Sequence, residues 1–411
     1  MSGSLFVKDT FSPVAARARR LSGEARVSVD SVALALHSYD AGLARFRPEA
    51  VISVAEASGL APLMRLLAEN GVPVTPRGLG SSLTGGCAPA KGGAVLKLGG
   101  LNKILEIDTA AGYAFVEAGV CNGVLQDELS RAGFFYSPLP LSFRCSTVGG
   151  NIAVNARGPR SLKYGSSADN LLAVDVVSPG GDEFRLERGC GGPDMAGFFS
   201  GLEGTCGVAA RVKVRITRRS GTLIYFLAAF NSPEELLLAA AQAQSQGVCF
   251  RSLEALDKMS ATASESCFGD GYPLDCGALA VGELDGHGAA DDLKTLKRVF
   301  KAAGCPWFKA DECDPKSEPV WLASSRAFSA VARLSHSVLS EDFSVPRKKL
   351  GLAIGAASAA LAQYDLRAGM VYSPCTGSLR PSILFDERNI FETRRARKAA
   401  HEMLKACAEM G

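Results

Sequence analysis

Short apolar segments separated by polar turns run through the first half of the chain and predict alternating strands and helices. Ala50–Val54 predicts a strand. Ser58–Gly71 predicts a helix, because apolar residues recur there at helical spacing ahead of a terminal glycine. A further strand ends at Pro76, and the patterns after it predict more strands, a hairpin-like pair and a helix that Gly133 closes. These later elements are strands at Ala94–Leu98, Ile104–Asp108 and Tyr113–Glu117, a helix at Cys121–Ala132, a pair over 171–186 and a strand at Val208–Ile216.

The pattern changes around Arg218–Gly221, which predicts one domain over residues 1–218 and a second over 219–411. In the second part, strands and helices alternate from Leu223 to Ala303, which predicts an α/β lobe with a small sheet and helices on one face. An Ala-rich helix and a strand at Ser382–Phe385 follow. The last segment predicts an amphipathic helix whose buried face is Ala396, Ala399, Met403, Cys407 and Met410.

The composition of the chain argues against several classes of function. The 411 residues are 47% hydrophobic and carry a net charge of only +3, so bulk electrostatics favours neither nucleic-acid binding nor a membrane surface. We expect no secretory signal at the N-terminus and no membrane insertion, since the longest apolar run, Leu350–Ala362, is too short to cross a bilayer. The 12 cysteines contain no C-x-x-C pair, which predicts reduced thiols in a cytoplasmic protein without its own iron–sulfur cluster or zinc site.

The stretch from Val72 to Gly86, VPVTPRGLGSSLTGG, has the composition of a diphosphate cradle. Glycines let backbone N–H groups approach a phosphate closely, and nearby serine and threonine hydroxyls add donors. A plain glycine-rich turn fits the same pattern. A Rossmann fingerprint is excluded because Leu83 occupies the third glycine position, and a P-loop is excluded because Gly-Lys-Ser/Thr is absent.

Two later stretches give the first one its context. They are STVGGNIAVNARG, from Ser146 to Gly158, followed by Ser161–Gly165, and FSGLEGTCGV, from Phe199 to Val208. In this order, the three stretches resemble the FAD-binding domain of the vanillyl-alcohol oxidase and p-cresol methylhydroxylase type, and most closely the flavoprotein subunits of glycolate oxidase and D-lactate dehydrogenase. The resemblance covers nearly the whole chain. It implies an α+β fold: an FAD-binding domain and a shortened α/β cap lobe.

The resemblance also implies a set of cofactor-binding residues. The pyrophosphate of FAD would lie on the first loop, at Pro76, Arg77, Gly78, Leu79, Gly80, Ser81, Ser82, Thr84 and Gly85. The flavin and its ribityl chain would be lined by Pro140, Ser146, Gly149, Gly150, Asn151 and Asn155, with backbone contacts from Gly204, Gly207 and Val208. Covalent members of the family attach flavin through a histidine in the first loop. Ser81 stands at that position, so we expect non-covalent FAD.

The catalytic groups of the family have no counterpart at the matching positions. Its members use an arginine after a tryptophan, a metal held by a histidine-rich segment and a later glutamate, and a following histidine. The metal segment aligns with Ser373–Pro381, so that Ser373 and Arg380 stand at the histidine positions. The arginine expected three residues after Trp321 is Ser324, with Arg326 two residues further on. The sequence stops at Gly411, before the segment that would carry the glutamate and the catalytic histidine. We therefore expect no metal site and a truncated cap.

Two arginines and several cysteines stand near these positions. Arg380 and Arg157 would hold an anionic ligand, or would be solvated or paired with local carboxylates. Cys145, Cys206 and Cys375 are interpreted as small apolar fillers. The basic residues of the last helix form either a solvated face or a docking face for an acidic partner.

Three hypotheses follow from these patterns. The first is a metal-free FAD-dependent oxidoreductase subunit with a degenerate active site, related to glycolate or D-lactate oxidation, which acts on a small anionic substrate and passes electrons to an iron–sulfur subunit. The second is a catalytically silent FAD-binding paralogue with a structural or electron-relay role beside a homologous flavoprotein. The third is a cap lobe adapted to another substrate, with Arg380, Arg157 or Tyr372 in new roles.

Overall fold

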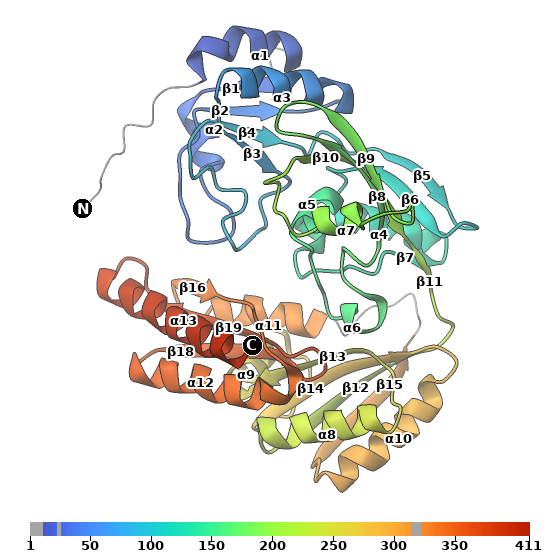
Figure 1. The fold of residues 1–411 in the computed structure, drawn as a ribbon. Helices are drawn as coiled ribbons and strands as arrows, with labels where there is room; N and C mark the ends of the chain where they lie inside the picture. The colour runs from blue at the N-terminus through green and yellow to red at the C-terminus, as the bar shows by residue number, and fades with distance from the viewer. Residues whose placement is uncertain (1–10, 23–25, 314–321) are drawn as a thin grey trace. The chain divides into compact units, whose positions relative to one another are not determined.

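The computed structural model describes residues 11–22, 26–313 and 322–411 (Figure 1). Within these ranges the chain forms two compact units. The first contains the residues up to Ser161 together with Gly165–Arg219, and the second contains Leu162–Tyr164 and Ser220–Gly411. The short segment Leu162–Tyr164 therefore belongs by its contacts to the second unit, although it interrupts the sequence of the first.

The first unit begins with a small sheet in the order β1-β2-β4-β3. The strands β2, β4 and β3 are parallel, and β1 joins β2 antiparallel. Helices α1 and α3 cover this sheet, and Leu60, Leu63 and Leu67 of α3 are buried against Ile52 and Leu96 of the strands. The elements are η1 (Ser12–Val14), α1 (Ala15–Ser22), β1 (Val27–Ser28), α2 (Ser31–Leu36), β2 (Ala50–Ser53), η3 (Ala57–Gly59), α3 (Leu60–Glu69), β3 (Val74–Arg77) and β4 (Ala94–Lys97).

A five-stranded antiparallel sheet, in the order β5-β6-β10-β8-β9, completes the first unit. In its core, Val116 and Val212 of the strands pack with Leu125, Ile152 and Phe199, which come from three helices. The elements are β5 (Ile104–Asp108), β6 (Tyr113–Glu117), α4 (Asn122–Arg131), β7 (Phe134–Phe135), η4 (Phe143–Cys145), α5 (Val148–Ala153), β8 (Leu171–Val177), β9 (Glu183–Glu187), α7 (Met195–Phe199), β10 (Val208–Arg215) and β11 (Thr217–Arg218), which pairs with β7.

The second unit is built on an eight-stranded antiparallel sheet, in the order β15-β12-β14-β13-β18-β19-β16, with β17 also paired to β19. Its longest ladder joins β12 to β14, from Leu223 opposite Asp285 to Phe230 opposite Ala278. The strands are β12 (Leu223–Phe230), β13 (Phe250–Asp257), β14 (Ala278–Asp285), β15 (Trp307–Cys313), β16 (Ser337–Ser340), β17 (Phe343–Ser344), β18 (Arg367–Ser373) and β19 (Ser378–Phe385).

Helices cover both faces of this sheet, so the prediction of a small sheet with helices on one face is wrong. Phe226 and Leu227 are consecutive in β12 and therefore point to opposite faces. Phe226 packs against Phe300 of α10, whereas Leu227 lies in a cluster with Ala261 of α9 and Ala327 of α11. All residues of β14 are buried, as covering both faces requires. The helices are α8 (Pro233–Ser245), α9 (Lys258–Phe268), α10 (Ala289–Ala302), α11 (Leu322–Ala332), η5 (Arg347–Lys349), α12 (Leu350–Gln363) and α13 (Ile390–Met410); α6 (Ser161–Tyr164) carries the short inserted segment.

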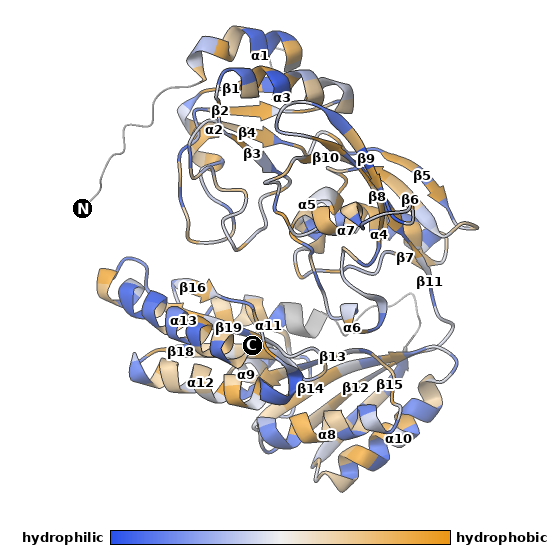
Figure 2. Ribbon diagram, viewed as in Figure 1, coloured by the Kyte–Doolittle hydropathy of each residue, from blue (hydrophilic) through white to orange (hydrophobic). Residues whose placement is uncertain are grey.

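The amphipathic character of α13 is confirmed, because Ala396, Ala399, Met403 and Cys407 are buried and Met410 is half-buried. Figure 2 shows hydrophilic residues along this helix and hydrophobic residues on the central strands of the same unit.

Truncation of the aromatic core should destabilise the second unit. The ring of Phe300 is 1% exposed and packs edge-on against Phe230, at a centroid distance of 5.2 Å, and also against Phe226 and Phe308. We expect Phe300→Ala to lower the free energy of unfolding by about 3–5 kcal/mol, measured by denaturant titration. As the control, Leu238→Ala on α8, where the side chain is 73% exposed, should change it by no more than about 0.5 kcal/mol. Equal losses in the two variants would contradict this account of the core.

Candidate functional site

Arg77, the last residue of β3, fixes the start of the glycine-rich loop that follows it. Its guanidinium is buried, and Nη1 donates to the carbonyl oxygen of Tyr39 at 2.6 Å. The carboxylate of Asp40 accepts hydrogen bonds from the backbone N–H groups of Gly85 and Gly42, both at 2.8 Å. Tyr39 and Asp40 therefore hold the loop at both of its ends.

Gly80 lies directly against the Arg77 guanidinium. Its φ is +79°, a conformation that side-chain-bearing residues rarely adopt, and a Cβ at this position would lie 2.1 Å from Nη2 of Arg77. The backbone of the loop thus passes next to a fixed positive charge, at a distance that only glycine allows.

The N–H groups at the tip of the loop point to no protein acceptor. Among the described residues, none of the backbone N–H groups from Leu79 to Leu83 donates a hydrogen bond, and the N–H of Thr84 reaches only the Ser82 hydroxyl at 3.3 Å. Successive unpaired N–H groups beside a guanidinium form an anion-binding site. The loop therefore fits a phosphate group by its own chemistry.

The three glycine-rich stretches meet within the first unit. A Cβ on Gly78 would lie 2.5 Å from the Thr147 hydroxyl oxygen, and one on Gly204 would lie 3.1 Å from Cγ of Pro76. The N–H of Glu203 donates to the carbonyl oxygen of Ala153 at 2.8 Å. Segments up to about 130 residues apart in sequence are thus within contact distance, through positions where a side chain would not fit.

Thr147 begins the second stretch as the N-cap of α5, where its hydroxyl accepts the N–H of Gly150 at 3.0 Å. Gly149 packs on Ala118, donating to its carbonyl oxygen at 2.8 Å, and a Cβ there would lie 2.5 Å from the Ala118 Cβ. Gly149 and Gly150 therefore bring the first turn of α5 close to the end of β6.

Ser146 and Asn151 belong to a buried hydrogen-bond network. Asn151 Nδ2 donates to the Ser146 hydroxyl at 3.1 Å, and Asn122 Nδ2 donates to Asn151 Oδ1 at 2.9 Å. Gln126 extends the network to the carbonyl oxygen of Tyr136. Because these amides are occupied by protein partners, their side chains fix the shape of the second stretch from within the unit.

Asn155 closes a loop that spans Ala156 to Ser167. Its φ is +47°, and its Oδ1 accepts the N–H of Ala168 at 2.9 Å, while the Ser167 hydroxyl donates to the carbonyl oxygen of Ala156. Gly158 packs against the backbone of Leu139 and Pro140, since a Cβ there would lie 2.1 Å from the Leu139 carbonyl oxygen. Pro140 and Asn155 are thus joined to one loop.

Gly207 and Val208 lie at the start of β10. The φ of Gly207 is +152°, and a Cβ there would lie 2.7 Å from Val176. Val208 pairs with Val177, and its side chain is buried in the core. The Val208 side chain is therefore turned into the core of the unit.

In the second unit, Ser373 and Arg380 are both engaged by protein groups. The Ser373 hydroxyl donates to the carbonyl oxygen of Leu253 at 3.1 Å, and the Arg380 guanidinium forms an ion pair with Glu254. Burial opposes ionisation of Arg380, but the negative charges of Glu254 and Asp342 outweigh it and raise the pKa of the guanidinium. Arg380 is therefore a paired, permanently charged group.

The structure describes two further candidate residues of the predicted cap lobe, Arg326 and Tyr372. Arg326 forms an ion pair with Asp270 and lies 5.2 Å from the ring of Phe268. Trp321 is outside the described residues, and the side chain of Ser324 in α11 is likewise not described. Tyr372 is 1% exposed, and burial raises the pKa of its hydroxyl, so it contacts the interior of the unit and not solvent.

The remaining candidates from the sequence are one arginine and three cysteines. Arg157, Cys145 and Cys206 are exposed, which for these two cysteines contradicts their interpretation as buried fillers. Cys375 is buried, and burial raises the pKa of its thiol to about 12, so it stays protonated at neutral pH. In the described ranges, no three His, Cys, Asp or Glu side chains are grouped to hold a metal ion.

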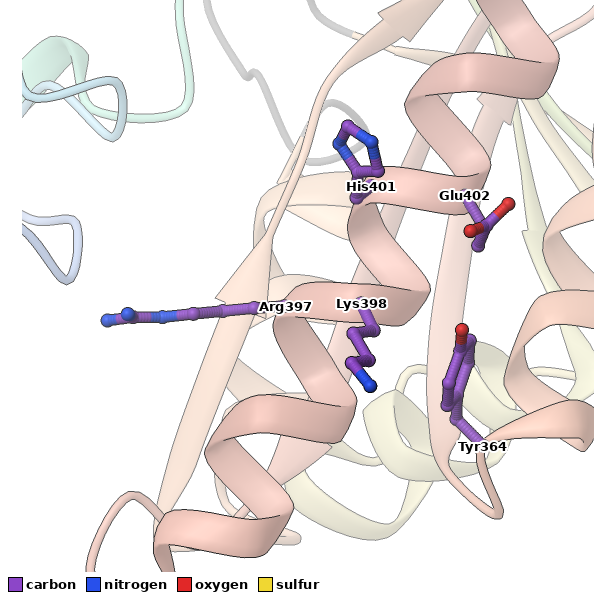
Figure 3. A pocket seen from close by; sticks show the side chains of 5 residues that line it. All are labelled: Tyr364, Arg397, Lys398, His401 and Glu402. Carbon is purple, nitrogen blue, oxygen red and sulfur yellow. The ribbon is translucent and has the colours of Figure 1, made fainter.

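A shallow hollow on α13 is a poor active-site candidate. It is lined by Tyr364, Arg397, Lys398, His401 and Glu402. Figure 3 shows that Arg397 extends away from Lys398 and Tyr364, while Glu402 lies on the side of Tyr364. Its charges are mixed and do not converge.

No described helix is both long and apolar enough for a membrane span.

Sequence reasoning missed the acidic partners Glu254 and Asp270. Glu254 is a charged residue within an otherwise mostly apolar, fully buried strand segment, Phe250–Leu256. That contrast is a signal for a buried ion pair, but the identity of the partner is not encoded locally, since Arg380 lies 126 positions away.

A side chain at Gly80 should abolish cofactor retention. Valine at this position would clash with the Arg77 guanidinium and require an unfavourable φ, so the N–H groups of the loop would be displaced. We expect purified Gly80→Val to lose the flavin absorbance that the unmodified protein carries. Gly71→Val is the matched control, because its φ is +64° but nothing lies within 4 Å of its Cβ. Full flavin content in Gly80→Val would refute the assignment of this loop.

Comparisons with known proteins agree with this architecture. Residues 48–187 match the FAD binding domain family, and residues 223–411 match the C-terminal domain of FAD linked oxidases. The chain is 30% identical to the glycolate oxidase subunit GlcD of Escherichia coli K12, over 89% of this chain and 74% of the relative. The same subunit of Bacillus subtilis is 30% identical over 95% of this chain and 85% of the relative. D-lactate dehydrogenase of Anaerostipes hadrus is 25% identical over 74% and 66%, respectively.

Solved structures agree at the level of the fold. Substrate-bound p-cresol methylhydroxylase superposes with a TM-score of 0.79 at 17% identity, over 97% of this chain and 87% of that one. An alkyldihydroxyacetonephosphate synthase also superposes with a TM-score of 0.79 at 17% identity, over 97% and 80%. The predicted resemblance, the α+β fold class and FAD as the cofactor are thereby confirmed. The chain belongs to the family of FAD-linked oxidoreductases that includes the glycolate oxidase subunit GlcD.

Proposed function

We propose that this chain is an FAD-dependent oxidoreductase subunit that works without a metal ion and passes electrons to a partner protein. The observation that carries the proposal is the meeting of the three glycine-rich stretches around N–H groups without an acceptor in the described residues. The metal-free part is supported by Arg380, which by the resemblance stands at a metal-ligand position and is paired with Glu254.

The pyrophosphate of FAD would be held by the loop from Pro76 to Gly85. Its N–H groups supply donors and Arg77 supplies positive charge, while the hydroxyls of Ser81, Ser82 and Thr84 add further donors. Ser81 stands where covalent members of the family carry a histidine, so the cofactor would be held non-covalently.

The second and third stretches would surround the rest of the cofactor. Gly149, Gly150 and Asn155 would offer backbone, since the side chains of Ser146 and Asn151 are occupied by each other. Pro140, Gly204, Gly207 and Val208 complete the proposed set. FAD, when bound, supplies two-electron oxidation chemistry.

The second unit supports a metal-free site through its charges. A guanidinium at Arg380 repels a divalent cation, and the Ser373 hydroxyl, already donating to Leu253, is a weak ligand compared with a histidine. A hydroxy-acid substrate would then have to be oriented by protein groups alone.

The proposed substrate is a small anion, and the proposed electron acceptor is a separate iron–sulfur or flavoprotein subunit. The names of two relatives, a glycolate oxidase subunit and a D-lactate dehydrogenase, support a small anionic substrate, and the first also supports a partner subunit. The described cysteines are all free thiols, which supports a reducing, cytoplasmic environment and a partner as the source of any cluster.

A second candidate function is a catalytically silent FAD-binding subunit with a structural or electron-relay role. It is favoured by the pairing of Arg326 with Asp270 and of Arg380 with Glu254. Both guanidiniums already have a carboxylate partner, so a substrate carboxylate would have to displace it.

The visible spectrum under anaerobic conditions separates these candidates. We expect the purified protein to show flavin absorbance that bleaches on addition of D-lactate or glycolate. Persistent absorbance with both acids would favour the silent subunit, whereas a protein that cannot bind FAD would overturn both functions.

Metal removal should have no effect. After dialysis against a chelator, we expect unchanged flavin content and an unchanged extent of substrate bleaching, and Ser373→Ala should behave like the unmodified protein. Stoichiometric zinc or manganese in the purified protein, with bleaching lost on chelation, would contradict the metal-free site.

A further inference from the structure

A turn of the first unit lies against the glycine-rich loop that follows β3. This segment, the Asp40 turn, runs from Tyr39 to Arg45, and these two residues pair as an antiparallel bridge. The Arg45 guanidinium lies over the Tyr39 ring, 5.0 Å from its centroid, and the N–H of Phe46 donates to the carbonyl oxygen of Ser38 at 2.7 Å. The turn is therefore closed at its base by its own residues, independently of the loop.

The Asp40 turn contacts the second half of the loop through backbone groups. The N–H of Ala41 donates to the carbonyl oxygen of Ser82 at 2.9 Å. Gly42 packs on the next residue of the loop, since a Cβ at this position would lie 2.6 Å from the Leu83 carbonyl oxygen. The turn and the loop therefore approach each other at a distance that a side chain at Gly42 would not allow.

The bond to Ser82 determines where the next N–H group of the loop points. The chain contains no cis peptide bond, and in a trans peptide the C=O and the N–H point in opposite directions. Because the Ser82 carbonyl is directed at the turn, the Leu83 N–H is directed away from it, and no described residue accepts it. The turn thus engages a carbonyl of the loop and leaves the adjacent donor for a ligand.

The Asp40 carboxylate joins the turn to the end of the loop. Asp40 is 4% exposed. Its Oδ1 accepts the N–H of Gly42 within the turn, and its Oδ2 accepts the N–H of Gly85 in the loop, both at 2.8 Å. Hydrogen bonds to an ionised acceptor are roughly twice as strong as neutral ones. One side chain therefore holds backbone groups of both segments.

A buried carboxylate is unexpected beside a loop that is proposed to bind a diphosphate, because like charges repel each other. Its geometry offers a reason for its presence. Both carboxylate oxygens of Asp40 are occupied by N–H groups, and the Arg77 guanidinium, which donates to the Tyr39 carbonyl oxygen at 2.6 Å, brings positive charge to the same segment. The hydrogen bonds of Asp40 favour a role in shaping the backbone over a direct effect of its charge on the ligand.

We infer that Asp40 is a positioning residue for the proposed diphosphate loop. By joining Gly42 to Gly85 it holds the Asp40 turn against the loop and keeps the N–H groups from Leu79 to Leu83 in place for phosphate oxygens. A loop that is fixed before binding has less conformational entropy to lose when FAD binds. This inference rests on the proposed function, since it requires that the loop holds the pyrophosphate of FAD.

Titration of the deflavinated full chain with FAD tests the inference. We expect Asp40→Asn to raise the Kd for FAD about tenfold, equivalent to about 1.4 kcal/mol. An amide offers one acceptor oxygen, so one of the two N–H groups would face a second donor and the loop would loosen. If the charge of Asp40 acted directly on the ligand, the same substitution would remove a repulsion and lower the Kd. A lower Kd would therefore overturn the inference.

The matched control is Glu49→Gln in the same unit. The Glu49 carboxylate also accepts two backbone N–H groups, those of Phe11 at 2.8 Å and Gly93 at 3.0 Å. Gly93 precedes β4 at the end of the sheet opposite Arg77, since Ala94 pairs with Val74 at the start of β3. We expect an unchanged Kd in this variant. A merely structural role for Asp40 predicts that the two substitutions change the Kd to the same extent or not at all, and either result would contradict the positioning role.

A glycine variant tests the same contact without changing a charge. Gly42→Ala would push the Leu83 carbonyl away from the turn, and we expect it to raise the Kd for FAD as well. Gly59→Ala is its control, because the nearest atom to a Cβ there is the Leu21 carbonyl oxygen at 3.9 Å. If Asp40→Asn does not fold, this pair decides, and equal Kd values in the two glycine variants reject the inference.

The unmodified protein keeps the two proposals apart. Failure of the unmodified chain to bind FAD sinks the proposed function and the inference with it. Tight binding of FAD that neither Asp40→Asn nor Gly42→Ala weakens sinks only the positioning role.

Discussion

Close packing of glycine residues against neighbouring segments is the constraint on which the proposed cofactor site depends. Gly78 lies against Thr147, Gly149 against Ala118, and Gly204 against Pro76, each at a distance that leaves little or no room for a Cβ. Because these contacts link segments remote in sequence, they fix the loop after β3 relative to α5 and to the start of β10. Within the described part of the chain, the N–H groups from Leu79 to Leu83 have no acceptor, so the backbone of the loop is held in place without using them.

Charge neutralisation inside the second unit is the other organising feature. Arg380 with Glu254, Arg326 with Asp270, and Lys163 with Asp285 each join a cation to a carboxylate within that unit. Buried ion pairs are weak stabilisers but costly to break on one side. Their effect here is to specify geometry: Arg380 is turned towards Glu254, and Lys163 is turned towards Asp285.

The two features serve different parts of the proposed reaction. The glycine contacts, with Arg77 and Asp40 at the two ends of the loop, shape the segment that is proposed to hold a phosphate. The ion pairs engage Arg380 and Arg326 with carboxylates, whereas Arg157 is exposed and lies two residues after Asn155, which is proposed to line the cofactor. An oxidoreductase of this design would rely on its cofactor domain for affinity and on its partner for the fate of the electrons.

The sequence by itself determined the local elements and the cofactor class. Period-two alternation located Ile104–Asp108 and Tyr113–Glu117 to the residue, because alternating burial is a local pattern. The glycine stretches indicated FAD through their resemblance to a known family. Tertiary structure alone decided the helices on both faces of the large sheet, the carboxylate partners of Arg380 and Arg326, and the contact of Lys163 with Asp285. The partners in these ion pairs lie from 56 to 126 residues apart. Strand order and register bring them together, and no local pattern of hydrophobic and polar residues encodes either.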